Sequence, residues 1–505
     1  MSVQQGESSR LLPPSAVLSI DAASDLGPGP RVPFGKEAAR LLALAWPISL
    51  LNLLQYVANQ MPIGFVGHLD SFSLSVAVLS WSILNVSGYA LLMGTAAALE
   101  TLCGQAYGGK QYQQLGYQLQ RSLLISLVMV LLICGLWMQL HPILLLLGQD
   151  PRISAATTRY LWLCVPSLPC IAAGECMRRY LLAQNSVLPS TLATLGATVL
   201  APLYAWALIF LSGLDLDGAA LACDLINATN AALLLGYLVW RERRLAGTPQ
   251  QTWHGWSREA WCGWGTYLRI ALPSLAMTVG EMWAFEVMIL LAGMLPDPER
   301  SVDVMGIAFT FGGAVYMVPL GLSGAVSARI ANELGAGEGL RARSVARAGT
   351  TLAAATLLGA AAAVLACRHQ YGWIFSNSEE VVAMLARVLL FVAALVVGDG
   401  VAAVQAGVVR GAGRQNWAAA MNLGTYWALG VPLAAWLAFR QHKGVFGLWA
   451  GIVIATNVQA VAMTVLVGAF DWPHEAQRAC ELVGEARGGA CRDGKEPSAR
   501  DIEFG

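Results

Sequence analysis

The feature that most constrains this chain is a series of apolar stretches of about 20 residues, which recurs along most of its 505 residues. Each stretch is long enough to cross a hydrocarbon layer about 30 Å thick as a helix. Hydrophobic side chains make up 56% of the chain and charged ones only 12%, against roughly 25% charged in a typical soluble domain. A soluble fold could not bury this much apolar surface. The sequence therefore predicts a polytopic membrane protein.

Counting the apolar runs predicts twelve transmembrane helices in an all-α fold. They are expected to begin near residues 38, 72, 118, 156, 187, 217, 266, 304, 344, 380, 417 and 445. The longest polar interruption contains four tryptophans and Arg258, which predict a short helix in the membrane interface. The predicted domains are a disordered cytosolic N-terminal tail (1–36), an N-lobe (37–240), a cytosolic linker (241–265), a C-lobe (266–471) and a cytosolic C-terminal tail (472–505).

The distribution of basic residues predicts the orientation. Most Lys and Arg residues of the connections, Arg341, Arg343 and Arg347 among them, follow even-numbered spans. The positive-inside rule places these connections and both termini in the cytoplasm. Lys+Arg 31 and Asp+Glu 31 balance, so the net charge gives no reason to expect nucleic acid as a partner.

The two groups of six spans resemble each other. Pro47 and Pro273 open the first and seventh spans in similar contexts, and RRYLLAQN (178–185) recurs as VRGAGRQN (409–416). Two tandem six-span units have the same topology, which implies lobes related by an axis along the membrane normal. We expect a solute site at the interface between the repeats, near the middle of the bilayer.

Two acidic residues lie inside predicted spans of the second repeat. Glu281 shares a helical face with Phe285 and Met288, and Asp399 is flanked by two glycines in an apolar run. An acid at the centre of a membrane helix costs about 2.5–3.5 kcal/mol, so each requires an account. Apolar surroundings disfavour the charged form, which allows an acid to hold and release a proton. The alternative is a carboxylate that only fixes helix packing.

The first span carries no acid. Alignment from the two prolines places Gln55 where Glu281 stands in the second repeat, and Asn52 and Asn59 are also neutral. We infer proton coupling by Glu281 and Asp399, with neutral hydrogen-bonding groups for substrate in the first repeat. The predicted substrate-binding residues are Gln55, Asn59, Trp283, Phe285, Glu286, Tyr316 and Gln405. For Glu286 the alternative is a pair with a basic group, and for the aromatic residues it is packing.

Four segments carry a resemblance to a known family. ETLCGQAYGGKQY (100–112), EMWAFE (281–286), SARIANELGAG (327–337) and GVVRGAGRQ (407–415) resemble multidrug and toxic compound extrusion (MATE) transporters of the plant-like branch. The resemblance implies two six-helix lobes forming a V-shaped cleft, and export of organic solutes in exchange for a cation, usually H⁺. It also implies that Glu281 and Asp399 are cation-coupling acids of the second lobe.

The sequence thus predicts a proton-coupled antiporter, not an enzyme, that alternates access between two lobes. The alternatives are Na⁺ coupling and a flippase of the same superfamily that moves lipid-linked oligosaccharides. Expected partners are a small organic solute, cationic or amphiphilic, and the lipid bilayer. We expect a monomer with no metal and no cofactor beyond the coupling ion H⁺. An acidic dileucine motif at 7–12 favours the vacuolar membrane, with the plasma membrane as the alternative.

Overall fold

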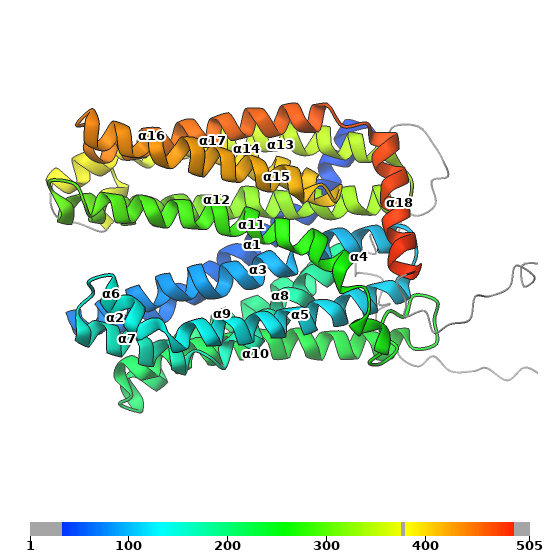
Figure 1. The fold of residues 1–505 in the computed structure, drawn as a ribbon, viewed down its shortest axis with the longest axis horizontal. Helices are drawn as coiled ribbons and strands as arrows, with labels where there is room; N and C mark the ends of the chain where they lie inside the picture. The colour runs from blue at the N-terminus through cyan, green and yellow to red at the C-terminus, as the bar shows by residue number, and fades with distance from the viewer. Residues whose placement is uncertain (1–32, 375–378, 489–505) are drawn as a thin grey trace, which may run out of the picture. The chain divides into compact units, whose positions relative to one another are not determined.

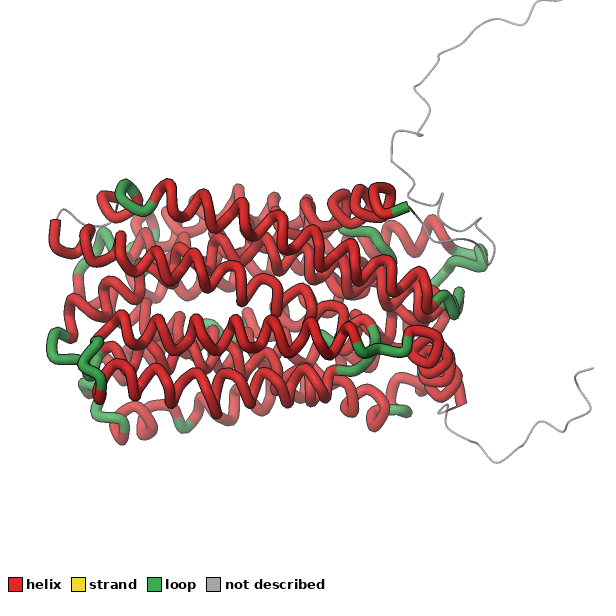
Figure 2. Tube along the Cα trace, turned by 90° about the horizontal axis from the view of Figure 1, so that it is seen from above, coloured by secondary structure: helices red, strands yellow, loops and turns green. Residues whose placement is uncertain are grey.

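The computed structural model describes residues 33–374 and 379–488. All regular elements in this part of the chain are helices, and the long ones run side by side (Figure 2). Ten helical stretches here are long and apolar enough to cross a membrane, and the bent pair α7 and α8 makes an eleventh. The continuous helical run over 415–440 provides the twelfth predicted span. The all-helical, twelve-helix fold predicted from the sequence is therefore confirmed.

The first half of the chain forms six spans between residues 34 and 245. Its second span is one continuous run interrupted by a π-helical turn, and its fourth span is bent by 54° between α7 and α8. The elements are α1 (Phe34–Val66), α2 (Ser71–Leu84), η2 (Asn85–Tyr89), α3 (Ala90–Ala96), α4 (Ala98–Gly108), α5 (Tyr112–Met138), α6 (Leu140–Leu146), α7 (Pro151–Leu163), α8 (Ser167–Ala183), α9 (Leu188–Trp206), η3 (Ala207–Leu211) and α10 (Asp215–Leu245).

The second half repeats this plan between residues 264 and 468. Its fifth span again contains π-helical stretches, one of them directly after the short helix Val431–Ala435, whose second residue is Pro432. The elements are α11 (Trp264–Ala292), α12 (Pro298–Gly335), α13 (Gly339–Cys367), η5 (Tyr371–Ile374), α14 (Glu379–Gly411), α15 (Gln415–Asn422), η6 (Leu423–Gly430), α16 (Val431–Ala435), η7 (Trp436–Arg440) and α17 (Gly444–Gly468).

Side-chain exposure separates an apolar outer surface from a packed interior. Leu131 and Val465 are 65% and 67% exposed although they lie within long helices. In water such exposure would be costly, whereas lipid tails cover apolar side chains without cost. The interior of the second half is one large apolar cluster that includes α1 residues such as Leu41 and Ile48. The first helix therefore packs against both halves.

The contacts between the halves are pseudo-symmetric. Gly94 lies so close to α11 that a Cβ atom there would stand 2.7 Å from Leu275 Cα, and a Cβ atom at Gly321 would stand 2.6 Å from Ser49 N. Leu275 and Ser49 each lie two residues after the aligned prolines, and the two glycines are equivalent in the repeat. Only glycine permits this approach of two backbones. The duplication read from the sequence thus appears as paired glycine contacts.

Two short helices lie outside the twelve spans. In the linker, Arg258–Trp261 form a single 3₁₀ turn, η4, whose position coincides with the predicted interfacial helix. The segment predicted as a C-terminal tail contains α18 (Trp472–Gly488), which the sequence analysis did not predict. Figure 1 shows α18 crossing one end of the bundle beside α4, and it contacts α4, α12 and α13. We call this end of the bundle the α18 end.

The predicted starts of the spans lie close to the observed ones. Helix α1 begins at Phe34 and α17 at Gly444, against predicted starts near 38 and 445. The N-terminal tail predicted at 1–36 and the dileucine motif at 7–12 lie outside the described residues, apart from the start of α1.

Candidate functional site

The second half holds two carboxyl groups, each bound by a tyrosine hydroxyl. Tyr316 of α12 donates to Glu281 Oε1 of α11 at 2.9 Å. Tyr426, in the π-helical stretch η6, donates to Asp399 Oδ1 of α14 at 2.9 Å. Asp399 is only 7% exposed. Four elements therefore converge on one pair of acids inside the bundle.

These two acids lack a basic partner within hydrogen-bonding distance. Among the described residues, no salt bridge involves Glu281 or Asp399, whereas the acids at the α18 end are paired with arginines. The two carboxyl groups interact electrostatically with each other. Phe285 packs against the apolar core, with its ring 6.0 Å from that of Tyr426 and 5.5 Å from that of Phe309. Repulsion between the half-buried Glu281 and the buried Asp399, together with the desolvation of Asp399, favours binding of at least one proton.

The first half has a neutral cluster in the corresponding place. Tyr89, which lies in η2, donates to Asn227 Oδ1 at 3.0 Å and lies 3.3 Å from Asn59 Oδ1. Tyr89 and Tyr316 are repeat equivalents, because each lies eleven residues before the aligned positions Glu100 and Ser327. The equivalent tyrosine hydroxyls thus contact amide groups in the first half and a carboxyl group in the second.

Two predicted substrate residues lie at the interface between the halves. Glu286 Oε2 accepts a hydrogen bond from Ser82 of α2 at 3.0 Å, so its partner is a hydroxyl of the other half. Trp283 is 41% exposed, and its Nε1 donates to Val86 O at 3.3 Å. Both side chains therefore contact the first half at the level of η2.

Gln405 lies away from this group. Its side chain is buried, and its Nε2 lies 3.2 Å from Thr350 Oγ1 of α13 and 3.2 Å from Thr464 Oγ1 of α17. These contacts tie three helices of the second half together. Gln55 is half-buried on α1, one turn before Asn59. The structure thus brings Glu281, Tyr316 and Asp399 together with Phe285, but not with Gln405.

Sequence analysis missed three residues of these clusters, Tyr426, Tyr89 and Asn227. The internal repeat could have predicted one of these three residues, because Tyr89 aligns with Tyr316. Tyr426 has no such signal. It reaches Asp399 because the π-helical stretch before Pro432 turns its side chain toward α14, and that stretch is a tertiary feature.

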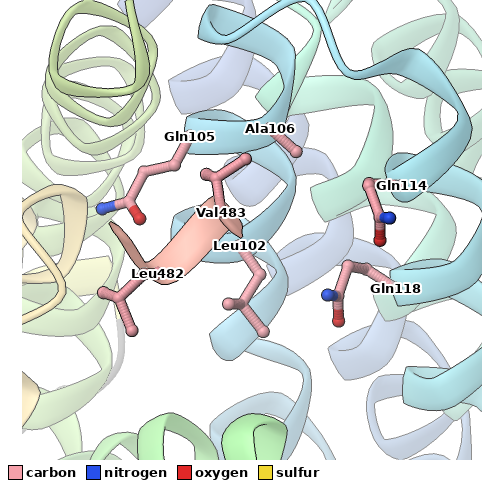
Figure 3. A pocket seen from close by; sticks show the side chains of 7 residues that line it. All are labelled: Leu102, Gln105, Ala106, Gln114, Gln118, Leu482 and Val483. Atoms are coloured by element: carbon pink, nitrogen blue, oxygen red, sulfur yellow. The ribbon is translucent and has the colours of Figure 1, made fainter. Parts of the chain in front are cut away.

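A small pocket lies at the α18 end, apart from the two acids. Figure 3 shows it between α4, α5 and α18, where Leu102 of α4 and Leu482 and Val483 of α18 are among the lining residues. The Oε1 atoms of Gln105, Gln114 and Gln118, which also line it, have no hydrogen-bond partner. Buried amide oxygens of this kind are commonly bridged by water. In the described part of the chain no group of three His, Cys, Asp or Glu side chains could hold a metal ion.

Comparison with known proteins agrees with the geometry. The family model described as MatE matches residues 47–207 and 273–436, one match in each half. Protein DETOXIFICATION 16 of Arabidopsis thaliana is 36% identical over 448 residues, which cover 89% of this chain and 91% of that protein. Protein DETOXIFICATION 17 of the same organism is 35% identical over 451 residues, 89% of this chain and 94% of that protein.

Solved structures share the fold. The crystal structure of the eukaryotic MATE transporter AtDTX14 superposes with a TM-score of 0.84 at 31% identity, and covers 89% of this chain and 99% of that one. An outward-facing multidrug resistance MATE family transporter superposes with a TM-score of 0.76 at 16% identity over 88% of this chain and 96% of that one, a likeness of fold alone. The chain is a multi-pass membrane protein and belongs to the MatE family of multidrug and toxic compound extrusion transporters.

Proposed function

We propose that the protein exports organic solutes in exchange for protons, and that Glu281 and Asp399 carry the protons. One observation supports this most strongly: both acids are enclosed in the second half with tyrosine hydroxyls, and not with arginines, as partners. No salt bridge stabilises the ionised form of either acid in these surroundings. The protonated form is therefore favoured relative to an acid that is paired with an arginine. The same acids become charged when water or a cationic solute reaches them.

The exchange follows from competition for these acids. With the site open to the cytoplasm, the ionised carboxylates bind an organic cation, and Trp283 and Phe285 offer aromatic surfaces for its planar parts. After the halves rock, protons from the acidic side neutralise Glu281 and Asp399, and the solute leaves. The hydroxyls of Tyr316 and Tyr426 hold the carboxyl groups in place in both states. A proton gradient supplies about 1.4 kcal/mol per pH unit.

The first half contributes neutral groups to the solute. Asn59 and Gln55 on α1 can donate and accept hydrogen bonds without changing charge. This asymmetry supports H⁺ rather than Na⁺ as the coupling ion, because hard cations prefer several carboxylate or carbonyl oxygens. Glu286 and Ser82 form a hydrogen bond across the interface between the halves. This bond breaks when the site opens at the end of the bundle where the two residues lie.

Proteoliposomes with a fluorescent organic cation inside provide the test. We expect a proton gradient to drive export, and a protonophore to abolish it. Glu281→Gln and Asp399→Asn should each reduce export to the level of empty liposomes. Gln405→Asn is the matched control inside the same half, because its contacts with α13 and α17 do not involve the acids.

Two outcomes would favour the alternatives. Export driven equally by a sodium gradient at constant pH would replace the proton by Na⁺. Movement of a lipid-linked oligosaccharide without any ion gradient would indicate a flippase. Export that persists in both acid variants would contradict the assignment of the coupling residues.

We also propose that both termini, and with them the α18 end, face the cytosol. The basic residues of the connections support this orientation. Protease added to sealed vacuolar or plasma membrane vesicles of known sidedness would test it, since cleavage beyond α18 should occur from the cytosolic face. The vesicle fraction that carries the protein decides between the two membranes.

A further inference from the structure

Arg410 connects the second half to the first at the α18 end. It lies in the last turn of α14, eleven residues after Asp399, which is about 16 Å along the helix. Its NH2 group donates to Ser323 Oγ of α12 at 2.8 Å. Its carbonyl accepts a hydrogen bond from Thr101 Oγ1 of α4 at 2.6 Å. One residue thus joins the acid-bearing helix to both halves.

The guanidinium of Arg410 faces Glu100 of the first half. Arg410 Nε and Glu100 Oε2 are 3.6 Å apart, and they do not form a hydrogen bond with each other. Glu100 is only 4% exposed, and its other oxygen is paired with Arg179. Two buried, oppositely charged atoms that face each other without a hydrogen bond form a pair that can still tighten.

The repeat explains why this pair is unbalanced. Arg179 and Arg410 are equivalent in the aligned segments 178–185 and 409–416, so pseudo-symmetry would give each arginine its own acid. The second-half equivalent of Glu100 is Ser327, which also faces Glu100. Two arginines therefore share one acid at the junction of the halves.

The surrounding charges do not correct this imbalance. In the first half, Glu100 and Glu175 balance Arg178 and Arg179, which are joined to them by ion pairs. Arg410 adds one positive charge. In the second half its charge acts on Glu281 and on Tyr316, and Glu281 in turn interacts with Asp399.

We propose that Arg410 is a positioning residue that couples the charge on Glu281 to closure of the α18 end. The inference rests on the function proposed above. When Glu281 is ionised, its longer-range attraction for Arg410 opposes that of Glu100, and the pair across the halves stays loose. When Glu281 is protonated, Glu100 is the remaining acid, and the pair draws α4 and α14 together. Acidic conditions should therefore favour closure of the α18 end.

A second ion pair between the halves provides a matched control. Arg329 of α12 contacts Glu37 of α1 at 3.1 Å and Glu333 at 2.7 Å. This ion pair lies near the start of α1. Arg329 has two acidic partners, and none of its described hydrogen bonds or ion pairs involves α14. It should hold the halves together whatever the charge on Glu281.

The experiment measures the distance between spin labels on the full-length protein in nanodiscs. Labels at Gln113→Cys in the first half and Arg343→Cys in the second lie on exposed positions of α5 and α13, in a background whose accessible cysteines are serine. A fivefold change in population corresponds to about 1 kcal/mol. We expect the open population to fall about fivefold from pH 8 to pH 5.5.

The variants distinguish an effect of Arg410 on the response to pH from a general effect on the stability of the closed state. Arg410→Gln should retain less than a twofold response to pH, and Arg410→Lys, which keeps the charge, should restore most of it. Arg329→Gln should raise the open population at both pH values and leave their ratio unchanged. A full pH response in Arg410→Gln would overturn the inference. If the wild type shows no response while protonophore-sensitive export persists, the inference fails and the proposed function stands; export that ignores proton gradients instead removes the proposed function.

Discussion

Tyr89 in the first half and Tyr316 in the second occupy equivalent positions of the repeat, but their hydroxyls contact different chemical groups. Tyr89 contacts the amides of Asn59 and Asn227, whereas Tyr316 donates to the carboxyl group of Glu281. The backbone plan was thus duplicated, whereas only one of these two equivalent tyrosines has a carboxyl group as its partner. Such a division allows one half to change charge while the other keeps its hydrogen-bonding character throughout transport.

The strongest challenge to this comparison is to move the acid between the halves. Gln55 and Glu281 are equivalent in the repeat, so the double variant Gln55→Glu with Glu281→Gln keeps the number of acids. We expect proton-driven export at the level of empty liposomes, because the hydroxyl of Tyr89 is engaged by Asn59 and Asn227. Export in proteoliposomes is the measurement. Recovery to half of the wild-type rate would mean that the position of the acid is unimportant.

Helix α18 attaches to the two halves by different means. Glu475 of α18 is buried and accepts hydrogen bonds from Arg414, and Arg478 of α18 donates to Gly413 O at 3.0 Å, so α18 is fixed to the second half. On the first half, Leu482 and Val483 only face the pocket beside α4. Glu475→Gln leaves two arginines short of an acid and should cost about 3 kcal/mol of stability.

Leu482→Ala removes a half-buried apolar contact and should cost about 1 kcal/mol. Thermal melting of the purified protein in one detergent compares the two variants. Equal shifts of the melting temperature would contradict the asymmetric attachment.

The two equivalent tyrosines sharpen the comparison at the site itself. Tyr316→Phe removes a donor to a carboxyl group, and hydrogen bonds to charged groups contribute about 1.5–3 kcal/mol. We expect export to fall about tenfold. Tyr89→Phe removes a donor to neutral amides, which contributes about 1 kcal/mol, and the rate should change less than threefold. Initial export rates at saturating proton gradient decide the outcome, and a larger loss in Tyr89→Phe would reverse the assignment of roles.

The smallest expected difference lies at the loop where each half begins its second span. Asp70 caps α2, and the pKa of its carboxyl group is lowered because the backbone N–H and the hydroxyl of Ser73 donate to it. Its equivalent Asp297, before Pro298, makes no such cap. A lowered pKa in the folded state means that the cap contributes above about pH 4 and is lost as the pH falls through the folded value.

Hydrogen exchange between pH 3 and pH 5 would measure this effect. Protection of the backbone amides at the start of α2 should decrease at acidic pH. Amides at the start of α12 should not show this decrease, because Asp297 does not cap that helix. Asp70→Asn retains a capping side chain without a titrating group, so it should remove the pH dependence. Equal acid sensitivity of both helix starts would contradict the prediction.

The fold was predictable because membrane-spanning helices leave a direct signal in the sequence. Apolar length gave the twelve spans, and the prolines and glycine motifs gave the repeat. Helix α18 escaped because its apolar residues Trp472, Ala476, Ala479 and Val483 alternate with charges over a short segment. Its helix is stabilised by packing on α12 and α13 and by Glu475, which are tertiary contacts.

The candidate site was predictable only in part. Glu281 and Asp399 stood out because isolated acids in apolar spans are costly. The hydroxyl of Tyr426 could not be assigned to Asp399, since the two lie on different spans and meet through a π-helical stretch. Gln405 looked like a cavity residue, yet its amide bridges Thr350 and Thr464 inside the helix packing. The neighbour that a polar side chain contacts depends on how the helices pack. This packing cannot be predicted from a single sequence.

The central claim, that protons are exchanged at the second half alone, has one direct test. An outward gradient of a fluorescent organic cation is imposed on proteoliposomes, and a pH-sensitive dye records proton movement in the opposite direction. We predict proton movement with the wild type and with Asn59→Leu, though slower in the latter, and none with Glu281→Gln combined with Asp399→Asn. Proton countermovement that survives in the double acid variant would contradict the account.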